Sequence, residues 1–184
     1  MSFSSIELCS KALNKIGANS ITSFEDGSVE SEICESIYLT LKHKLLSLYY
    51  WSFATKTAEL EPKESNEKYG YSYAYILPVD FLRAVKIESN LKYKIAGSYL
   101  FSDDEKVKLE YIADVDEQNF SPLFVSSFIY LIAAELSISL LNDTSKYSLF
   151  YRLFNSEIKE AKSIDSMQET NKKIKNFSLI DTRK

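Results

Sequence analysis

Few side chains in this 184-residue sequence have the type and spacing that chemistry requires. Glu135 is the most suggestive, because it lies in the middle of a long apolar stretch. Burial there would raise the pKa of its carboxyl group, so that it could act as a general acid. A glycosidase also needs a second carboxylate, which can come from anywhere in the chain. A hydrogen-bonded structural carboxyl, or one that faces a neighbouring subunit, is the more common arrangement.

The other reactive side chains favour structural roles. His43 lies between two lysines with no nucleophile nearby, which indicates an exposed structural residue. Cys9 and Cys34 fall on apolar faces of expected helices without a partner at metal-ligand spacing, so we interpret both as small buried hydrophobes. The acidic run 103–105 lacks the further oxygen ligands of a calcium loop and is typical of a solvated turn. The sequence therefore predicts no catalytic residue, no metal site and no cofactor.

One aromatic pattern indicates a binding surface. Tyr69, Tyr71, Tyr73 and Tyr75 alternate with smaller residues, as in a strand with one aromatic face. Such a face can stack nucleobases, but nucleobase platforms usually lie in a basic groove, and only Lys68 is close. Packing against a helix or another subunit is the alternative that we favour. We therefore predict that these four tyrosines form a subunit interface.

Composition and charge restrict the class of protein. The length suits one domain, and 45 % apolar residues with only four glycines argue against a disordered or collagen-like chain. The net charge is −4, but residues 170–184 hold five basic side chains and one acidic one. This segment therefore carries +4, and the rest of the chain carries −8. Two contact surfaces of opposite charge are one interpretation, and a solvated terminus is the other.

Capping residues mark the ends of four expected helices. Ser4 and Glu7 have the spacing of a capping box, and Gly17 is a typical helix stop. No signal peptide is evident, and serines and Glu135 interrupt the third apolar helix, so a cytoplasmic protein with a buried central helix is expected rather than a membrane span. The later helices are expected from Ser28 to about Tyr50, from Pro122 to Leu141, and from Asp143 to about Gln168.

In the middle of the chain, apolar residues recur at every second position instead of at helical spacing. This alternation indicates strands, which are expected to form a meander. The sequence thus predicts a mainly helical α+β protein. It would be a four-helix bundle with a small antiparallel β insertion between the second and third helices, followed by an extended C-terminal tail. The expected segments are 1–50 and 121–168 for the two helical pairs, 51–120 for the insertion and 169–184 for the basic tail.

The order of these signals resembles the tail tubular protein A family of short-tailed bacteriophages, the head-to-tail adaptors that dock beneath the portal. The motifs are individually weak, and their order over residues 3 to about 168 carries the resemblance. They are ALNKIGA at 12–18, ITSFEDGS at 21–28, WSFA at 51–54, YAYILPVDF at 73–81, YKI at 93–95, LEYI at 109–112 and AAEL at 133–136.

The resemblance implies a non-enzymatic virion protein, made in the cytoplasm of the bacterial host and placed at the head–tail junction. It implies a ring, with twelve subunits in that family, whose partners are the portal protein and the tail nozzle protein. Genome DNA would pass through the lumen without specific binding, and no membrane would be involved. A tail-associated hydrolase of cell-wall glycan, with Glu135 or another acid at its centre, is the alternative. The arm expected to grip the portal contains Lys172, Lys173, Lys175, Phe177 and Ile180.

Overall fold

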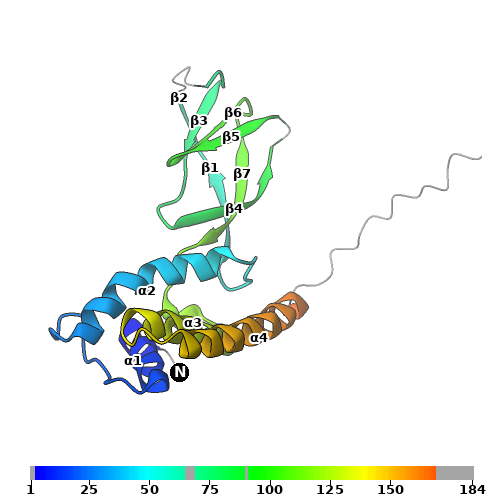
Figure 1. Ribbon diagram of the computed structural model, residues 1–184. Helices are drawn as coiled ribbons and strands as arrows, with labels where there is room; N and C mark the ends of the chain where they lie inside the picture. The colour runs from blue at the N-terminus through cyan, green and yellow to red at the C-terminus, as the bar shows by residue number, and fades with distance from the viewer. Residues whose placement is uncertain (1–2, 65–68, 90, 169–184) are drawn as a thin grey trace, which may run out of the picture.

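The computed structural model describes residues 3–64, 69–89 and 91–168. A layer of α-helices carries a lobe of β-strands that stands off one end of it (Figure 1). The elements in chain order are α1 (Ser5–Ile16), α2 (Val29–Ser47), β1 (Thr55–Leu60), β2 (Pro62–Glu64), β3 (Tyr73–Ile76), β4 (Phe81–Glu88), β5 (Tyr93–Ala96), β6 (Tyr99–Ser102), β7 (Val107–Ala113), the 3₁₀ turn η1 (Glu117–Asn119), α3 (Pro122–Ser139) and α4 (Thr144–Gln168).

The helices begin at the predicted capping residues. The Ser4 hydroxyl accepts a hydrogen bond from the backbone N–H of Glu7 at 3.2 Å, and the Glu7 carboxylate accepts one from the Ser4 N–H at 2.8 Å. Gly17 ends α1 with a φ of 83°, a left-handed conformation that glycine adopts without steric strain. Ser28 and Ser121 cap α2 and α3 through their side chains. These predictions are confirmed, although α2 and α3 end a few residues earlier than expected.

α3 is the centre of the helical layer, because α1, α2 and α4 all pack against it. Its side chains are apolar around most of the circumference, and Phe124, Phe128, Leu131 and Ile132 are fully buried. The helix is long and apolar enough to cross a membrane, but 61 % of it is buried inside the protein. A helix that is hydrophobic on all sides is typical of a protein core, and three neighbouring helices explain that pattern here.

The β-lobe contains two antiparallel sheets with strand orders β1-β7-β4 and β2-β3-β6-β5. β1 pairs with β7 along its whole length, so that Thr55 lies opposite Ile112. β4 pairs with the other edge of β7, and two register shifts bend it. Leu100 of one sheet and Leu109 of the other are fully buried and belong to the main hydrophobic core. The lobe therefore has an interior of its own that is continuous with that of the helices.

The predicted four-helix bundle with a small β insertion is wrong. Seven strands in two sheets make this a mixed α+β fold. The expected meander is also wrong, because β3 pairs with β6 and β4 pairs with β7, and neither pair is consecutive in the sequence. Pro78 lies between β3 and β4, where the chain leaves one sheet for the other. Local alternation marks where strands run, but pairing joins distant segments, and the alternation does not specify the partner.

An aromatic cluster joins the helices to the lobe. The only tryptophan, Trp51, is fully buried, and its indole N–H donates to the carbonyl of Leu45 at 3.1 Å. Its ring stacks on Phe53 at 5.8 Å and meets Phe124 of α3 edge-on at 5.1 Å. The rings of Trp51 and Phe53 therefore hold the corner between α2 and β1 against the central helix α3.

Candidate functional site

The four predicted interface tyrosines do not share one face. Only Tyr73 and Tyr75 lie in β3, while Tyr69, with a φ of 79°, and Tyr71 lie in the loop that precedes the strand. Tyr75 is fully buried and its hydroxyl donates to the backbone carbonyl of Asp104. Tyr75 thus packs inside its own chain and presents no surface to a second subunit.

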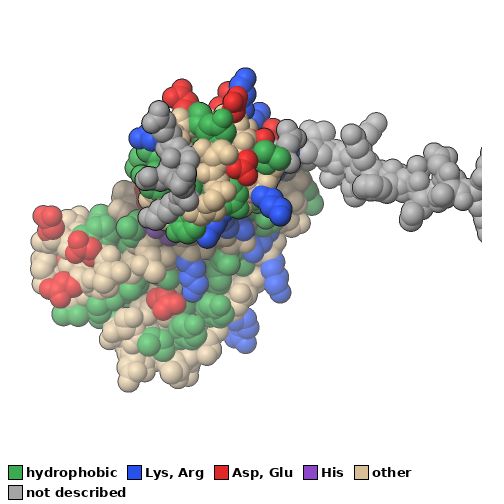
Figure 2. Space-filling view, turned by 90° about the horizontal axis from the view of Figure 1, so that it is seen from above, with side chains coloured by type: hydrophobic (Ala, Val, Ile, Leu, Met, Phe, Trp, Pro, Cys, Tyr) green, Lys and Arg blue, Asp and Glu red, His purple; other side chains and the backbone are tan. Residues whose placement is uncertain are grey.

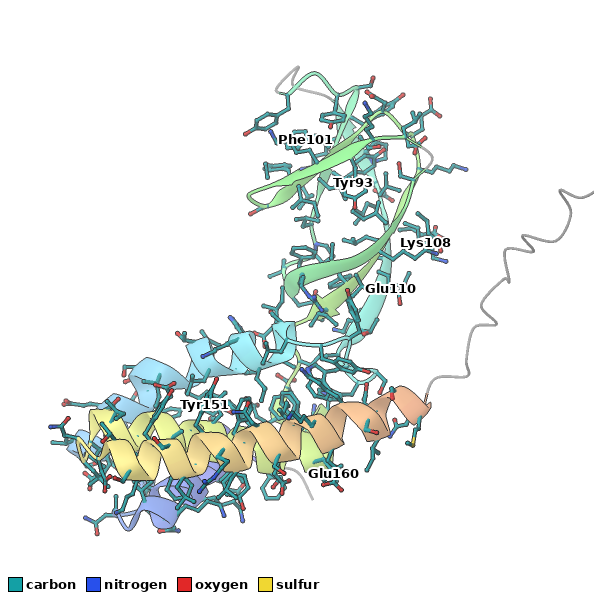
Figure 3. All side chains as sticks on the ribbon, turned by 45° about the vertical axis from the view of Figure 1, so that its right-hand side comes forward. Tyr93, Phe101, Lys108, Glu110, Tyr151 and Glu160 are labelled. Carbon is teal, nitrogen blue, oxygen red and sulfur yellow. The ribbon has the colours of Figure 1, made fainter. Side chains whose placement is uncertain are left out.

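Tyr69 instead belongs to an exposed aromatic patch on the outer face of the β2-β3-β6-β5 sheet. Its ring meets Phe101 edge-on at 5.1 Å, and the Lys94 ammonium lies 3.8 Å from its centroid. Tyr99 and Ile76, which are paired across β6 and β3, extend the same face and are 43 % exposed. Figure 3 shows Phe101 near the far end of the lobe, well away from the helices. This patch suits contact with another protein, because half-exposed tyrosines are typical of interfaces.

The predicted portal-binding residues Lys172, Lys173, Lys175, Phe177 and Ile180 lie outside the described residues. Their role therefore stays a prediction.

The end of α4 is fixed to the aromatic corner. Asp165 is buried, and its carboxylate accepts hydrogen bonds from the Ser52 backbone N–H at 3.0 Å and from the Ser52 hydroxyl at 2.7 Å. The last turns of α4 thus lie beside the joint between the helices and the lobe (Figures 1 and 3).

The acidic run 103–105 forms structural hydrogen bonds. Asp103 accepts from the backbone N–H and hydroxyl of Ser72, at 2.8 and 2.9 Å. Glu105 accepts from the Tyr73 hydroxyl at 3.2 Å, and this contact raises the pKa of Tyr73. The described parts of the chain contain no group of three or more His, Cys, Asp or Glu side chains placed to hold a metal ion.

The cysteines are placed as predicted, and Glu135 is only partly enclosed. Cys9 and Cys34 are fully buried and free, so their interpretation as small hydrophobic residues is confirmed. A hydrogen bond with Cys34, together with burial, raises the pKa of Cys9. Glu135 is half-buried on α3. Burial raises the pKa of Tyr147, and the negative charge of Glu135 adds to that effect.

A polar network that the sequence did not predict ties α2 to the end of β7. Lys42 is only 7 % exposed, and its ammonium lies 3.0 Å from Asp114 and 3.4 Å from Glu117. The Tyr38 hydroxyl donates to Glu117 at 2.9 Å, and His43 Nε2 lies 2.9 Å from Asp114 Oδ2. His43 is therefore a structural residue, but it is paired rather than simply exposed. A lysine on the mainly apolar inward face of α2 is the sequence signal that could have pointed to buried acidic partners.

A groove of about 450 Å³ lies between α1 and α3. Phe3, Val125 and Ile129 supply its apolar lining, and Lys11 and Lys15 stand at its rim. The Lys11 ammonium lies 5.3 Å from the centroid of Phe3. Within the described part of the chain neither lysine forms an ion pair. The groove therefore combines an apolar floor with two positive charges that have no carboxylate partner.

A second hollow, of about 620 Å³, lies at the edge of the lobe where β1 passes into β2. Figure 3 shows Lys108 and Glu110 on this side of the sheets. Four carboxylates and two lysines line it, so its net charge is negative and it would repel phosphate groups. The charged lining residues are Glu59, Glu61, Glu88, Glu105, Lys106 and Lys108.

Acidic residues gather where α2 begins. Figure 2 shows carboxylates over this end of the helical layer. Glu32 and Glu35 are exposed on α2, and Val29 and Leu39 on the same helix are 61 % and 55 % exposed. An outward helix face that carries two large aliphatic side chains beside carboxylates is a candidate contact surface.

The sequence matches no protein-family model and no curated protein. The resemblance to the tail tubular protein A family therefore depends on the order of the motifs along the chain.

Proposed function

We propose that this protein is a structural head-to-tail adaptor of a short-tailed bacteriophage. It would dock as a ring on the portal protein, extend the DNA channel and provide the attachment site for the tail nozzle protein. The motif order suggests the family. The structural observation that carries the proposal is the two-part shape, in which the β-lobe stands off one end of the helical layer (Figure 1).

A subunit with two separate ends can contact two different partners. The Trp51 cluster and the bonds between Ser52 and Asp165 join the lobe firmly to the helices, so a load on one part would be transmitted to the other. The motif WSFA at 51–54 lies at this joint, and the motif YAYILPVDF at 73–81 spans the passage between the two sheets. Both motifs are thus explained by architecture, without an active site.

The charge distribution suits the same role. Residues 1–169 carry −8, and an acidic channel wall would repel DNA phosphates and let the genome slide without specific binding. The basic segment 170–184 would bind the portal, with Lys172, Lys173, Lys175, Phe177 and Ile180 as its contact residues. If that segment becomes ordered on binding, the loss of conformational entropy would offset part of the affinity that its contacts provide.

The test is the mass of the full chain, with and without the portal ring of the same phage, by native mass spectrometry. We expect the portal ring to gain many copies of the chain. A chain shortened after Gln168 is expected to keep its circular dichroism spectrum but to lose docking. A variant with Lys172, Lys173 and Lys175 changed to Glu serves as a full-length comparison. A portal ring that gains no mass would refute the adaptor function, whereas docking by the shortened chain would refute only the role of the tail.

A further inference from the structure

We infer that copies of this chain associate head-to-tail, with the outward face of α2 from one copy seated in the α1–α3 groove of the next. This contact would supply the subunit interface of the proposed ring, and to that extent it rests on the proposed function. Two surfaces on opposite sides of the helical layer carry the inference, since α2 forms the top of the layer and α1 the bottom in Figure 1.

The groove needs an acidic partner with an apolar side. Lys11 and Lys15 have no carboxylate partner among the described residues, and their ammonium groups lie only over aromatic rings, of Phe3 and Tyr130 respectively. The Lys15 ammonium is 4.5 Å from the centroid of Tyr130. An incoming carboxylate could therefore pair with each lysine without breaking an ion pair within the subunit.

The outward face of α2 has that chemistry. Glu32 and Glu35 are exposed, and within the described chain neither side-chain carboxylate has a hydrogen-bonded or ionic partner. Val29 and Leu39 flank them at helical spacing, and each has more than half of its surface exposed. The two aliphatic side chains would fill the apolar groove, and the carboxylates would reach the lysines at its rim.

The spacing of the charges matches as well. Lys11 and Lys15 are four residues apart on α1, and Glu32 and Glu35 are three apart on α2, so each pair spans one helical turn. Two helices packed side by side can therefore form both ion pairs together. The occupant of the groove is therefore a second copy of this chain, because the same molecule carries both of the complementary surfaces.

The geometry also determines the kind of assembly. The two surfaces are different and lie on opposite sides, so the contact is heterologous rather than two-fold symmetric. Each bound copy leaves one groove and one α2 face free for the next. Such a contact produces a closed ring when the rotation between copies closes, and a filament when it does not.

Charge reversal tests the contact with the full chain alone, by sedimentation velocity over a range of protein and salt concentrations. We expect the wild-type chain to associate, and to do so less as salt rises. A groove variant (Lys11→Glu with Lys15→Glu) and a face variant (Glu32→Lys with Glu35→Lys) are each expected to associate at least tenfold more weakly, because each places like charges opposite one another.

An equimolar mixture of the two variants provides the decisive comparison. In the mixture each groove meets a face of opposite charge, so association is expected to return to within a few-fold of wild type, with the variants alternating. A matched variant with Lys63→Glu and Lys159→Glu, exposed lysines outside the groove, is expected to associate like wild type. Circular dichroism checks that every variant is folded.

Three results would overturn the inference: a wild-type chain that stays monomeric up to its solubility limit, unchanged association of both variants, or failure of the mixture to restore it. If the groove bound an unrelated acidic protein but not the α2 face of a second copy, the groove would belong to another partner and the inference would be wrong. The outcome is separate from that of the portal experiment. A chain that self-associates through these surfaces but does not bind a portal would leave this inference intact and refute the adaptor function.

Discussion

The Asp165 carboxylate lies 2.7 Å from the Ser52 hydroxyl and joins the last turns of α4 to the corner where the chain enters the β-lobe. These residues are 113 positions apart in the sequence. Asp165 also accepts the Ser52 backbone N–H at 3.0 Å and is only 6 % exposed. The buried acceptor thus holds the helical layer and the lobe together near the C-terminal end of α4.

Replacing Asp165 with Ala should destabilise the protein by about 2 kcal/mol, because it leaves a partly buried backbone N–H without its acceptor. Urea denaturation followed by circular dichroism measures this loss. Ser166→Ala is a neighbouring control on the exposed side of α4, where a change of less than about 0.5 kcal/mol is expected. Equal effects of the two substitutions would contradict the role of Asp165 in the joint.

The Asp114 carboxylate makes the stability of the protein depend on pH. Burial alone would raise its pKa, but hydrogen bonds from His43 and Lys42 outweigh that effect and hold the pKa below the ordinary value of 3.8. A carboxyl group whose pKa is lower in the folded protein stabilises the fold above its unfolded pKa, and this contribution is lost as pH falls through the folded pKa. We therefore expect stability to fall as the pH drops from just above 4.

Asp114→Asn should flatten this acid dependence, because the amide does not titrate. The measurement is the free energy of unfolding in urea at several pH values between about 3 and 6. Asp143→Asn, at the cap of α4, serves as the comparison. An acid dependence that is unchanged in Asp114→Asn would show that other carboxylates, such as Asp80 with its own lowered pKa, dominate the effect.

Two nitrogens of the Arg83 guanidinium are unsatisfied. Within the described structure its Nε and Nη2 atoms are buried without a hydrogen-bond partner, and the group lies 4.5 Å from the centroid of the Tyr50 ring. Arg83→Met keeps most of the packing and removes the unsatisfied donors, so we expect it to be neutral or to stabilise the protein by up to about 1 kcal/mol.

Thermal unfolding of Arg83→Met and Arg83→Ala, compared with wild type, checks this expectation. Arg83→Ala should be the less stable of the two, because it also removes the aliphatic stem of this half-buried side chain. A clear loss of stability in Arg83→Met would indicate that the contact with Tyr50 outweighs the cost of the buried nitrogens.

Glu135 distinguishes the adaptor from the alternative hydrolase. We expect suspensions of bacterial cell walls to stay turbid when the purified chain is added, and Glu135→Gln to behave in the same way. The measurement is the loss of turbidity with time, with lysozyme as the positive control. Clearing by the wild-type chain that disappears in Glu135→Gln would favour the hydrolase and count against a purely structural role.

The ends of the helices were predictable because their signals are local. The hydrogen bonds between Ser4 and Glu7 span three residues, and the cap at Gly17 forms its hydrogen bonds with Leu13 and Asn14 in the preceding turn. The burial of Cys9 and Cys34 was predictable for the same reason, since helical periodicity alone places them on an inward face.

The sequence by itself determined where the helices begin, where they end to within a few residues, which residues are apolar and how charge is divided along the chain. Only the tertiary structure decided that Thr55 pairs with Ile112, that Tyr69 and Tyr75 lie on different faces, and that Lys42 meets Asp114. The physical reason is distance along the chain. Capping and periodicity act within a few residues, whereas strand pairing and buried ion pairs form between segments that meet only when the whole core assembles.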